Sequence, residues 1–227
     1  MRGKLVLIDG IDGSGKSTVM QEIIDHLNIV GKKIFDIRDY GRANNKIPEF
    51  SDIPDYDIYI SSEPSYGKIG REIKEELLKP KRNYSGYTIS NAFALDREIL
   101  YKKLIIPALD AGKTVIQEKG ITTTFIYQPV QMRIPLSSLM NLPGNKLAMK
   151  YAPNLVIILD IEPEVAAMRI NNQDLIFDEL TFKRKIAFRY KEEWFQKMFK
   201  VKYLNVNPPK TEEQIKNELS SLINGVL

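Results

Sequence analysis

The feature that most constrains this chain is a glycine-rich segment near its N-terminus. It reads Gly10-Ile11-Asp12-Gly13-Ser14-Gly15-Lys16-Ser17, with Thr18 after it, and it fits the phosphate-loop pattern G-x-x-x-x-G-K-[ST]. An apolar run at residues 4–8 precedes it as a strand would, and apolar residues follow at helical spacing over 20–27. Between a strand and a helix, such glycines let backbone N–H groups point at phosphate oxygens. Residues 10–18 therefore predict a site for a nucleoside triphosphate.

Charged residues at two further strand ends are candidates for chemistry. Within the loop, Lys16 would reach the outer phosphates and Ser17 would ligate Mg²⁺. Glu63 and the pair Glu118-Lys119 end apolar runs, where the carboxyl ends of parallel strands gather beside such a loop. A carboxylate there can hold Mg²⁺ through water or accept a proton, and a cation can bind an acceptor phosphate. Any one of these charges alone is more commonly a solvated surface group, but their agreement at two strand ends favours a site.

Phe93 and Arg97 lie four residues apart in a helical pattern, so they share a face. A stacking ring and a hydrogen-bonding guanidinium could together hold a nucleobase. By spacing alone, the plainer interpretation is favoured: Phe93 belongs to the core and Arg97 is a surface charge.

Strand-like runs alternate with helical patterns along the whole chain, which predicts an α/β fold with a parallel sheet. We expect a three-layer α/β/α domain over residues 1–227, with a mostly five-stranded parallel sheet flanked by helices. Residues 39–57 are polar and rich in Pro, Asn and Asp, and they predict a long loop.

The composition excludes several classes of protein. Cysteine is absent from the sequence, which rules out disulfides and cysteine-based metal sites. No apolar run is long enough to span a membrane, and the chain enters a strand with no signal peptide before it. The net charge is +4, a surplus that a nucleotide-phosphate site explains as well as a nucleic-acid groove does. We expect a cytoplasmic protein that binds small-molecule nucleotides, and neither nucleic acid nor a membrane.

Taken together, several blocks of the sequence resemble the thymidylate kinases, a branch of the nucleoside monophosphate kinases. The blocks are residues 7–18; Ser61-Ser62-Glu63-Pro64 with Ile69-Gly70, where the family has S-R-E-P and I-G; Asn91-Ala92-Phe93-Ala94-Leu95-Asp96-Arg97, like F-A-A-D-R; residues 106–116, like I-x-P-A-L-x-x-G-x-x-V-I; Thr123 with Tyr127-Gln128, like S-x-x-A-Y-Q; and residues 153–166, like P-D-L-x-x-x-L-D-x-x-P-E-x-A. They occur in the family's order over most of the chain.

The resemblance implies ATP-dependent phosphorylation of dTMP to dTDP, with Mg²⁺ as cofactor and a homodimer as the assembly. It implies catalytic roles for Lys16, Asp12, Glu118 and Lys119, and a metal held by Ser17, Asp12 and Glu118. The ATP-binding residues would be Gly10, Ile11, Asp12, Gly13, Ser14, Gly15, Lys16, Ser17 and Thr18. The substrate-binding residues would be Glu63, Phe93, Arg97, Lys119, Thr123, Thr124, Tyr127 and Gln128. In this assignment Phe93 stacks on thymine and Arg97 hydrogen-bonds it, which overrides the interpretation from spacing.

The chain departs from the family pattern at three places. Glu118-Lys119 replaces an Asp-Arg pair, and a lysine lacks the planar two-point fork of arginine. Ser62 replaces the arginine of S-R-E-P, and Arg38 or Arg42 is a candidate to supply that contact. The expected lid, about residues 171–179, has no basic residue over 171–176, although Arg169, Lys183, Arg184 and Lys185 flank it.

Two alternatives stay open at this stage. One is a kinase of the same fold that acts on a deoxynucleoside or another monophosphate, in which Glu63 would take the proton of a sugar hydroxyl. The other is a catalytically weak nucleotide-binding protein whose arginines have been lost.

Overall fold

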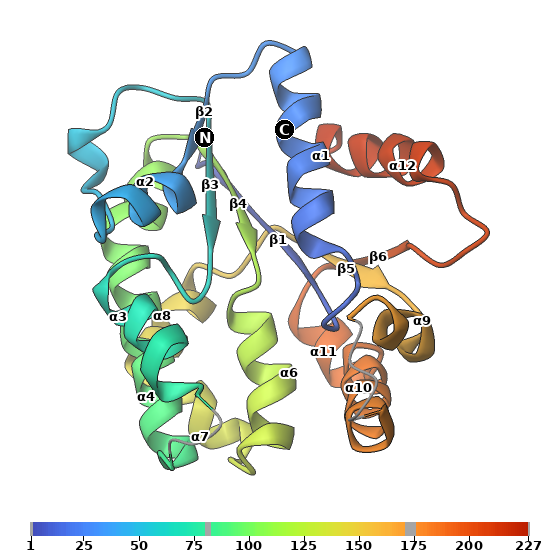
Figure 1. Ribbon diagram of the computed structural model, residues 1–227. Coiled ribbons are helices and arrows are strands. Elements are labelled where there is room, and N and C mark those ends of the chain that lie inside the picture. Colours follow the sequence, from blue (N-terminus) through green and yellow to red (C-terminus); the bar gives the residue numbers. More distant parts are fainter. Residues whose placement is uncertain (1, 80–82, 171–175, 227) are drawn as a thin grey trace.

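A parallel sheet forms the centre of the computed structural model, which describes residues 2–79, 83–170 and 176–226, without the side chains of 176–178. In this part of the chain the sheet has six strands in the order β2-β3-β4-β1-β5-β6, all parallel (Figure 1). The strands are β1 (Lys4–Gly10), β2 (Ile34–Asp36), β3 (Ile58–Ser62), β4 (Thr114–Glu118), β5 (Leu155–Asp160) and β6 (Val201–Asn205). The expected parallel α/β architecture is confirmed, with one strand more than the five expected. The short edge strands β2 and β6 are only partly buried, so their apolar pattern is weaker.

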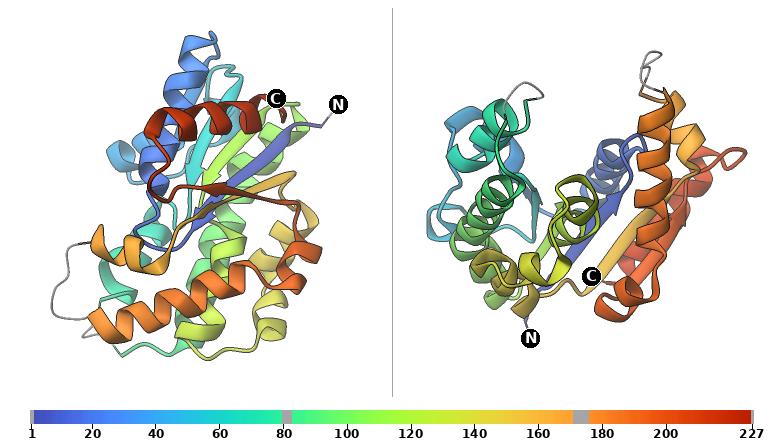
Figure 2. Two further views of the ribbon diagram at one scale, coloured as in Figure 1. Left: turned by 90° about the vertical axis from the view of Figure 1, so that its right-hand side faces the viewer. Right: turned by 90° about the horizontal axis from the view of Figure 1, so that it is seen from below.

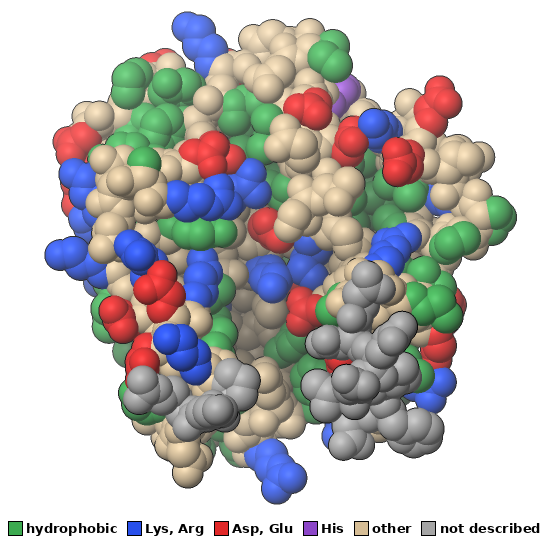
Figure 3. All heavy atoms as spheres, in the orientation of Figure 1, with side chains coloured by type: hydrophobic (Ala, Val, Ile, Leu, Met, Phe, Trp, Pro, Cys, Tyr) green, Lys and Arg blue, Asp and Glu red, His purple; other side chains and the backbone are tan. Residues whose placement is uncertain are grey.

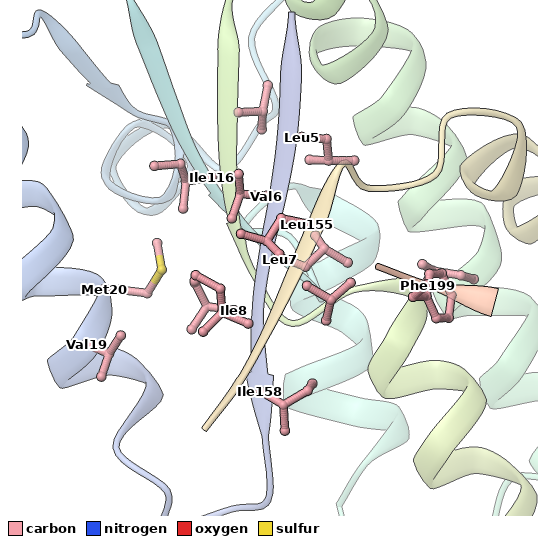
Figure 4. Close-up of a cluster of buried hydrophobic side chains, with 14 of the residues drawn as sticks. Leu5, Val6, Leu7, Ile8, Val19, Met20, Ile116, Leu155, Ile158 and Phe199 are labelled. Carbon is pink, nitrogen blue, oxygen red and sulfur yellow. The ribbon is translucent and has the colours of Figure 1, made fainter. Parts of the chain in front are cut away.

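The central strands are buried on both faces. The apolar residues of β1 are at most 1% exposed, as continuous apolar strands between two helical layers should be. In Figure 4, Val19 and Met20 of α1 (Lys16–Ile29) lie on one side of β1, and Phe199 lies on the other. Because successive side chains of a strand point to opposite faces, β1 anchors both halves of the core.

Helices cover both faces of the sheet (Figure 2). On one face α1 packs against α12 (Glu212–Asn224), and on the other α5 (Ile106–Asp110) and α6 (Ile121–Gln131) contact β4 and β1. The remaining helices are α3 (Lys68–Glu72), followed by a π-helical turn at Ile73–Leu77; α4 (Gly86–Leu100), joined to α5 by a π-helical turn at Tyr101–Ile105; α7 (Leu136–Met140); α8 (Pro143–Lys150); α9 (Pro163–Met168); α10 (Ile176–Tyr190); and α11 (Glu193–Met198).

The predicted long loop over residues 39–57 is wrong for its start, which is helical. The helix α2 (Ile37–Asn44) occupies its start, and a 3₁₀ turn spans Phe50–Asp52. The side chain of Asp36 caps α2 by accepting a hydrogen bond from the backbone N–H of Arg38 at 2.8 Å. Apart from Ile37 and Gly41, α2 buries no residue, so few apolar residues mark it as a helix in the sequence. Of the expected lid, residues 171–175 lie outside the described residues.

The register of the sheet gathers the predicted site at one edge. Ile8 of β1 pairs with Glu118 of β4, and Ser62 of β3 pairs with Glu118 as well. The carboxyl ends of these strands therefore bring residues 10–18, 63 and 118–119 together, as expected for a ligand site in an open parallel sheet.

Candidate active site

The glycine-rich segment lies between β1 and α1, as the sequence predicts. Gly13 has φ +90° and Gly15 has φ +89°, a region that residues with a Cβ rarely adopt. A Cβ on Gly13 would also lie 2.3 Å from the carbonyl oxygen of Ala166. Glycine is therefore required at position 13, both for the turn and for the close approach of α9.

Lys16 is held inside this loop. Its Nζ donates hydrogen bonds to the carbonyl oxygens of Gly10 at 2.8 Å and Ile11 at 2.9 Å. Burial lowers the pKa of Lys16, and the nearby charge of Lys119 lowers it further. The ammonium thus stands where backbone N–H groups of the same loop would receive phosphates.

The Asp12 carboxylate is surrounded by lysines. Its Oδ1 lies 3.6 Å from the Nζ of Lys16 and 3.6 Å from the Nζ of Lys119. Burial by itself would raise the pKa of Asp12, but the charges of Lys119, Lys16 and Lys183 lower it below the usual value. The carboxylate is therefore ionised at neutral pH and holds a cluster of cations beside the loop.

Ser17 and Glu118 offer oxygen ligands to a divalent cation. The Oγ of Ser17 donates to the Oε1 of Glu118 at 3.2 Å, and Arg38 approaches the Oε2 at 3.5 Å. No group of three carboxylate or imidazole side chains that could cage a metal exists among the described residues. Such a sparse set suits Mg²⁺, which commonly binds one or two protein oxygens together with water and substrate phosphates. The residues present fit that ion.

A cleft of about 260 Å³ opens beside the cluster, and Figure 3 shows charged side chains around the hollow in this face. All eight predicted substrate-binding residues line it, together with Asp12, Pro64, Leu78, Gly120, Gln131 and Met132. Lys119 and Asp12 thus belong both to this cleft and to the cluster around the phosphate loop.

Arg97 lies at the back of the cleft and is 1% exposed. Its Nη2 donates to Glu63 at 2.5 Å and to the Oγ1 of Thr124 at 2.7 Å, and its Nη1 donates to Asn145. The expectation from spacing that Arg97 is a surface charge is wrong. A guanidinium can be buried here because a carboxylate and neutral acceptors share its donors. Phe93, on the same helix face, is half-buried in the cleft wall.

Both carboxylate oxygens of Glu63 are occupied. Oε2 accepts from Arg97, and Oε1 accepts from the Nε2 of Gln117 at 3.0 Å. Burial raises the pKa of Glu63, opposed by the charge of Arg97. Glu63 therefore holds Arg97 in place, and its side chain also forms part of the cleft wall.

Asp9 is a buried anchor that the sequence reasoning missed. Its Oδ2 accepts from the hydroxyls of Thr122 at 2.6 Å and Thr123 at 2.7 Å, so it ties the start of α6 to β1. Asp9 lies within the apolar strand before the glycines, and an acidic residue in a strand so deeply buried is the signal that could have indicated such a role.

A second cleft of about 520 Å³ lies on the other side of the loop. The loop residues Gly13, Ser14 and Gly15 line it, with Arg169 and Val206 from the ends of α9 and β6. Arg169 is exposed, and its Nη2 donates to the carbonyl oxygen of Val206 at 3.3 Å. A chemical group attached to phosphates that are bound in the loop could therefore enter this cleft.

The two arginines considered for the contact that Ser62 lacks have partners already. Arg38 binds Asp36 and Glu118, and Arg42 binds Asp39 at 2.5 Å and the hydroxyl of Tyr66 at 3.1 Å. Lys74 is engaged as well, because its Nζ donates to the carbonyl oxygen of Ser65 at 3.1 Å and lies 3.5 Å from the centre of the Tyr66 ring.

Of the basic residues that flank the expected lid, Lys183 points inward. It is 4% exposed and pairs with Glu179 at 2.9 Å, whereas Arg184 and Lys185 are exposed. The neighbouring Phe182 packs edge-on against Tyr127, with ring centres 5.9 Å apart. Tyr127 lines the cleft. The contact between Phe182 and Tyr127 therefore places the part of α10 that carries Lys183 beside the cleft.

The geometry can be compared with known proteins. The model of the thymidylate kinase family matches residues 50–219. This chain belongs to the thymidylate kinase family. It is 28% identical to a thymidylate kinase of Caldicellulosiruptor saccharolyticus over 231 residues, covering 100% of this chain and 98% of that protein. It is 30% identical to a probable thymidylate kinase of Pyrobaculum aerophilum, with 98% and 97% covered.

A solved thymidylate kinase structure from Ehrlichia chaffeensis matches the fold with a TM-score of 0.68 at 18% identity, covering 100% of this chain and 99% of that one. Across the residues that the structure describes, no helix combines the length and apolar character needed to cross a membrane.

Proposed function

We propose that this protein transfers the γ-phosphoryl group of ATP to the 5′-phosphate of dTMP, forming dTDP. The observation that carries the proposal is the position of Asp12, which lines this cleft together with Lys119 and has its carboxylate 3.6 Å from the Nζ of Lys119 and 3.6 Å from the Nζ of Lys16 in the phosphate loop. A triphosphate in the loop and a monophosphate in the cleft would meet at this cluster. Positioning and charge neutralisation are the main requirements of phosphoryl transfer.

On the donor side, the backbone of residues 10–18 and Lys16 would hold the phosphates. Ser17 and Glu118 would hold Mg²⁺, which supplies further neutralisation of phosphate charge when bound. The second cleft, beside Arg169, is the natural place for the adenine base because it adjoins the same loop.

On the acceptor side, Phe93 would stack on the base while Arg97 donates a hydrogen bond to it. Thr123, Thr124, Tyr127 and Gln128 complete the wall of this cleft. Lys119 would bind the acceptor phosphate as a point charge.

Lys183 would replace the missing lid arginines. Its burial and its influence on the pKa of Asp12 support this role, because a cation beside the transferring group stabilises the charge that develops there.

The nucleoside kinase alternative needs Glu63 as a base with a free oxygen. Both oxygens of that carboxylate accept hydrogen bonds from Arg97 and Gln117, so no specific observation favours this alternative. The proposal also includes a cytoplasmic homodimer, as the family resemblance implies.

Product formation over a panel of acceptors tests the proposal. With ATP and Mg²⁺, we expect phosphorylation of dTMP to exceed that of GMP and thymidine by at least about a hundredfold in kcat/KM. Preferred turnover of thymidine would assign Glu63 the role of base and contradict the proposal. ATP binding without turnover of any acceptor would support a non-catalytic nucleotide-binding protein instead.

A further inference from the structure

The guanidinium of Arg97 is held by a residue outside every motif described above. Glu63 and Thr124 bind its Nη2, and both line the acceptor cleft. The Oδ1 of Asn145, on α8, accepts from its Nη1. We propose that Asn145 is a positioning residue that fixes Arg97 for recognition of the pyrimidine base of the acceptor, an inference that rests on the proposed function.

The side chain of Asn145 has one orientation that satisfies both of its neighbours. The residue is 0% exposed, and its Nδ2 donates to the carbonyl oxygen of Leu139 at 2.7 Å. A carbonyl only accepts and a guanidinium only donates. Turning the amide over would place its donor against Arg97 and its acceptor against Leu139, which leaves two buried mismatches. The acceptor oxygen is therefore held towards Arg97.

The neighbouring Gly144 brings α8 close enough for this contact. A Cβ at position 144 would lie 1.8 Å from the carbonyl oxygen of Ala94 on α4, so the two helix backbones approach as closely as a glycine permits. Ala94 precedes Arg97 on α4 by about one helical turn. The close packing of α8 on α4 thus places Asn145 beside the guanidinium of Arg97.

The hydrogen bonds to Nη1 and Nη2 fix the orientation of the Arg97 guanidinium and leave other N–H groups free to donate to a ligand. An arginine has five N–H donors in a rigid plane, and Asn145, Glu63 and Thr124 take three of them. The Nε has no partner among the described residues, although it is buried. With Nη1 and Nη2 both held, the plane cannot rotate, and the remaining donors keep a fixed direction.

The chemistry of this arrangement favours one kind of base. A group that only donates selects a base carbonyl over an amino group, because an amino group opposite it would leave two donors facing each other. Thymine has a carbonyl at position 4 of the ring where cytosine has an amino group, so a donor that faces this position favours thymine. Because Asn145 is neutral, it orients Arg97 without adding a second carboxylate beside Glu63, so less of the guanidinium charge is neutralised.

The test compares Asn145→Ala and Asn145→Asp with the wild type and with Asn141→Ala. The control removes an exposed amide that donates to Ser137, away from Arg97. Calorimetric titration with dTMP, without ATP, gives the Kd, and steady-state kinetics give kcat and KM for dTMP, dCMP and ATP. We expect Asn145→Ala to raise the Kd and KM for dTMP about tenfold and to reduce the preference for dTMP over dCMP. Its kcat and its KM for ATP should change less than about twofold.

Asn145→Asp keeps an acceptor oxygen for Arg97, so we expect it to lose less dTMP affinity than Asn145→Ala. Both variants disturb the contact with Leu139, and thermal unfolding shows whether each still folds. Lower melting temperatures with unchanged dTMP Kd and unchanged preference would make Asn145 a purely structural residue and overturn the inference. Wild-type protein that binds dTMP without forming dTDP would contradict the proposed function alone, whereas wild-type protein that binds no dTMP would overturn both.

Discussion

At the scale of single residues, the main feature of the site is the group of lysines around the Asp12 carboxylate. Lys16 and Lys119 lie within 3.6 Å of its carboxylate, and Lys183 is close enough to lower its pKa. Lysines held this closely repel one another unless an anion lies among them. Asp12 provides that anion here, and transferring phosphates would add to it.

Replacing Lys183 with alanine should lower kcat about a hundredfold, because one charged donor at a developing negative charge is worth that much. The KM for dTMP should change less than about threefold. Lys185→Ala is the matched control, since Lys185 is exposed on the same helix, and it should retain wild-type kcat. Steady-state kinetics of both variants check this, and equal loss in the two variants would exclude a specific role for Lys183.

Lys74 should make stability depend on pH. Burial lowers the pKa of Lys74 from 10.5 to about 8, partly offset by Asp96 and Glu118 and reinforced by Arg42 and Lys119. Below pH 8 the group is charged in both the folded and the unfolded protein, so the full cost of burying the charge is present.

Between pH 8 and 10.5 the folded protein has released this proton while the unfolded chain still binds it, so the free energy of unfolding should rise relative to a Lys74→Met variant. Urea denaturation of both proteins from pH 7 to 11 measures the difference. A constant difference across that range would show that the pKa of Lys74 is not lowered.

The family resemblance predicted which side chains meet in the cleft, whereas residue spacing alone predicted the environment of Arg97 wrongly. The phosphate loop, Glu118 and Lys119 could be predicted because each follows a recognisable strand. The burial of Arg97 could not, because it depends on acceptors from α6 and α8 that are distant in the chain.

At the scale of elements, the close contact between α4 and α8 fixes the back wall of the cleft. The helices in this region, α7 and α8, are short, and Pro135 and Pro143 stand at their starts. The polar composition of α2, by contrast, concealed a helix that the sequence did not predict. Tertiary packing stabilises such short helices more than their intrinsic helix propensity does.

Gly144→Ala should lower the free energy of unfolding by about 1–3 kcal/mol, since the added methyl would collide with the carbonyl oxygen of Ala94. An alanine normally stabilises a helix relative to glycine by about 0.5–1 kcal/mol, so the clash has to exceed that gain. Gly225→Ala is the control, because Gly225 has φ −70° and its Cβ would be 3.4 Å from the nearest atom. If denaturant titration gave the same free energy of unfolding for the two variants, the close approach of α8 to α4 would be refuted.

At the scale of the whole molecule, the parallel sheet places the phosphate loop and the cleft lined by Arg97 at one edge, and α4 presents apolar side chains outward. Tyr87 is 54% exposed and Leu95 is 48% exposed on that helix. A subunit interface that covered α4 would remove both side chains from water.

If α4 contributes to the proposed homodimer, Leu95→Glu should convert dimer to monomer while leaving the secondary structure intact, because a buried carboxylate without a partner opposes association. Light scattering coupled to size exclusion measures both proteins. Glu98→Lys, a charge change at a partly exposed position of the same helix, is the control. A monomeric wild-type protein would contradict the proposal of a homodimer.

Transfer of label from ATP to dTMP tests the central claim most directly. Protein, Mg²⁺, dTMP and ATP labelled in the γ-phosphate are incubated together, and the nucleotides are separated by chromatography, with Lys16→Met as the control. We expect label in dTDP at the β-phosphate with the wild-type protein and almost none with the variant. Label that remained in ATP or appeared only as inorganic phosphate, with dTMP unchanged, would contradict it.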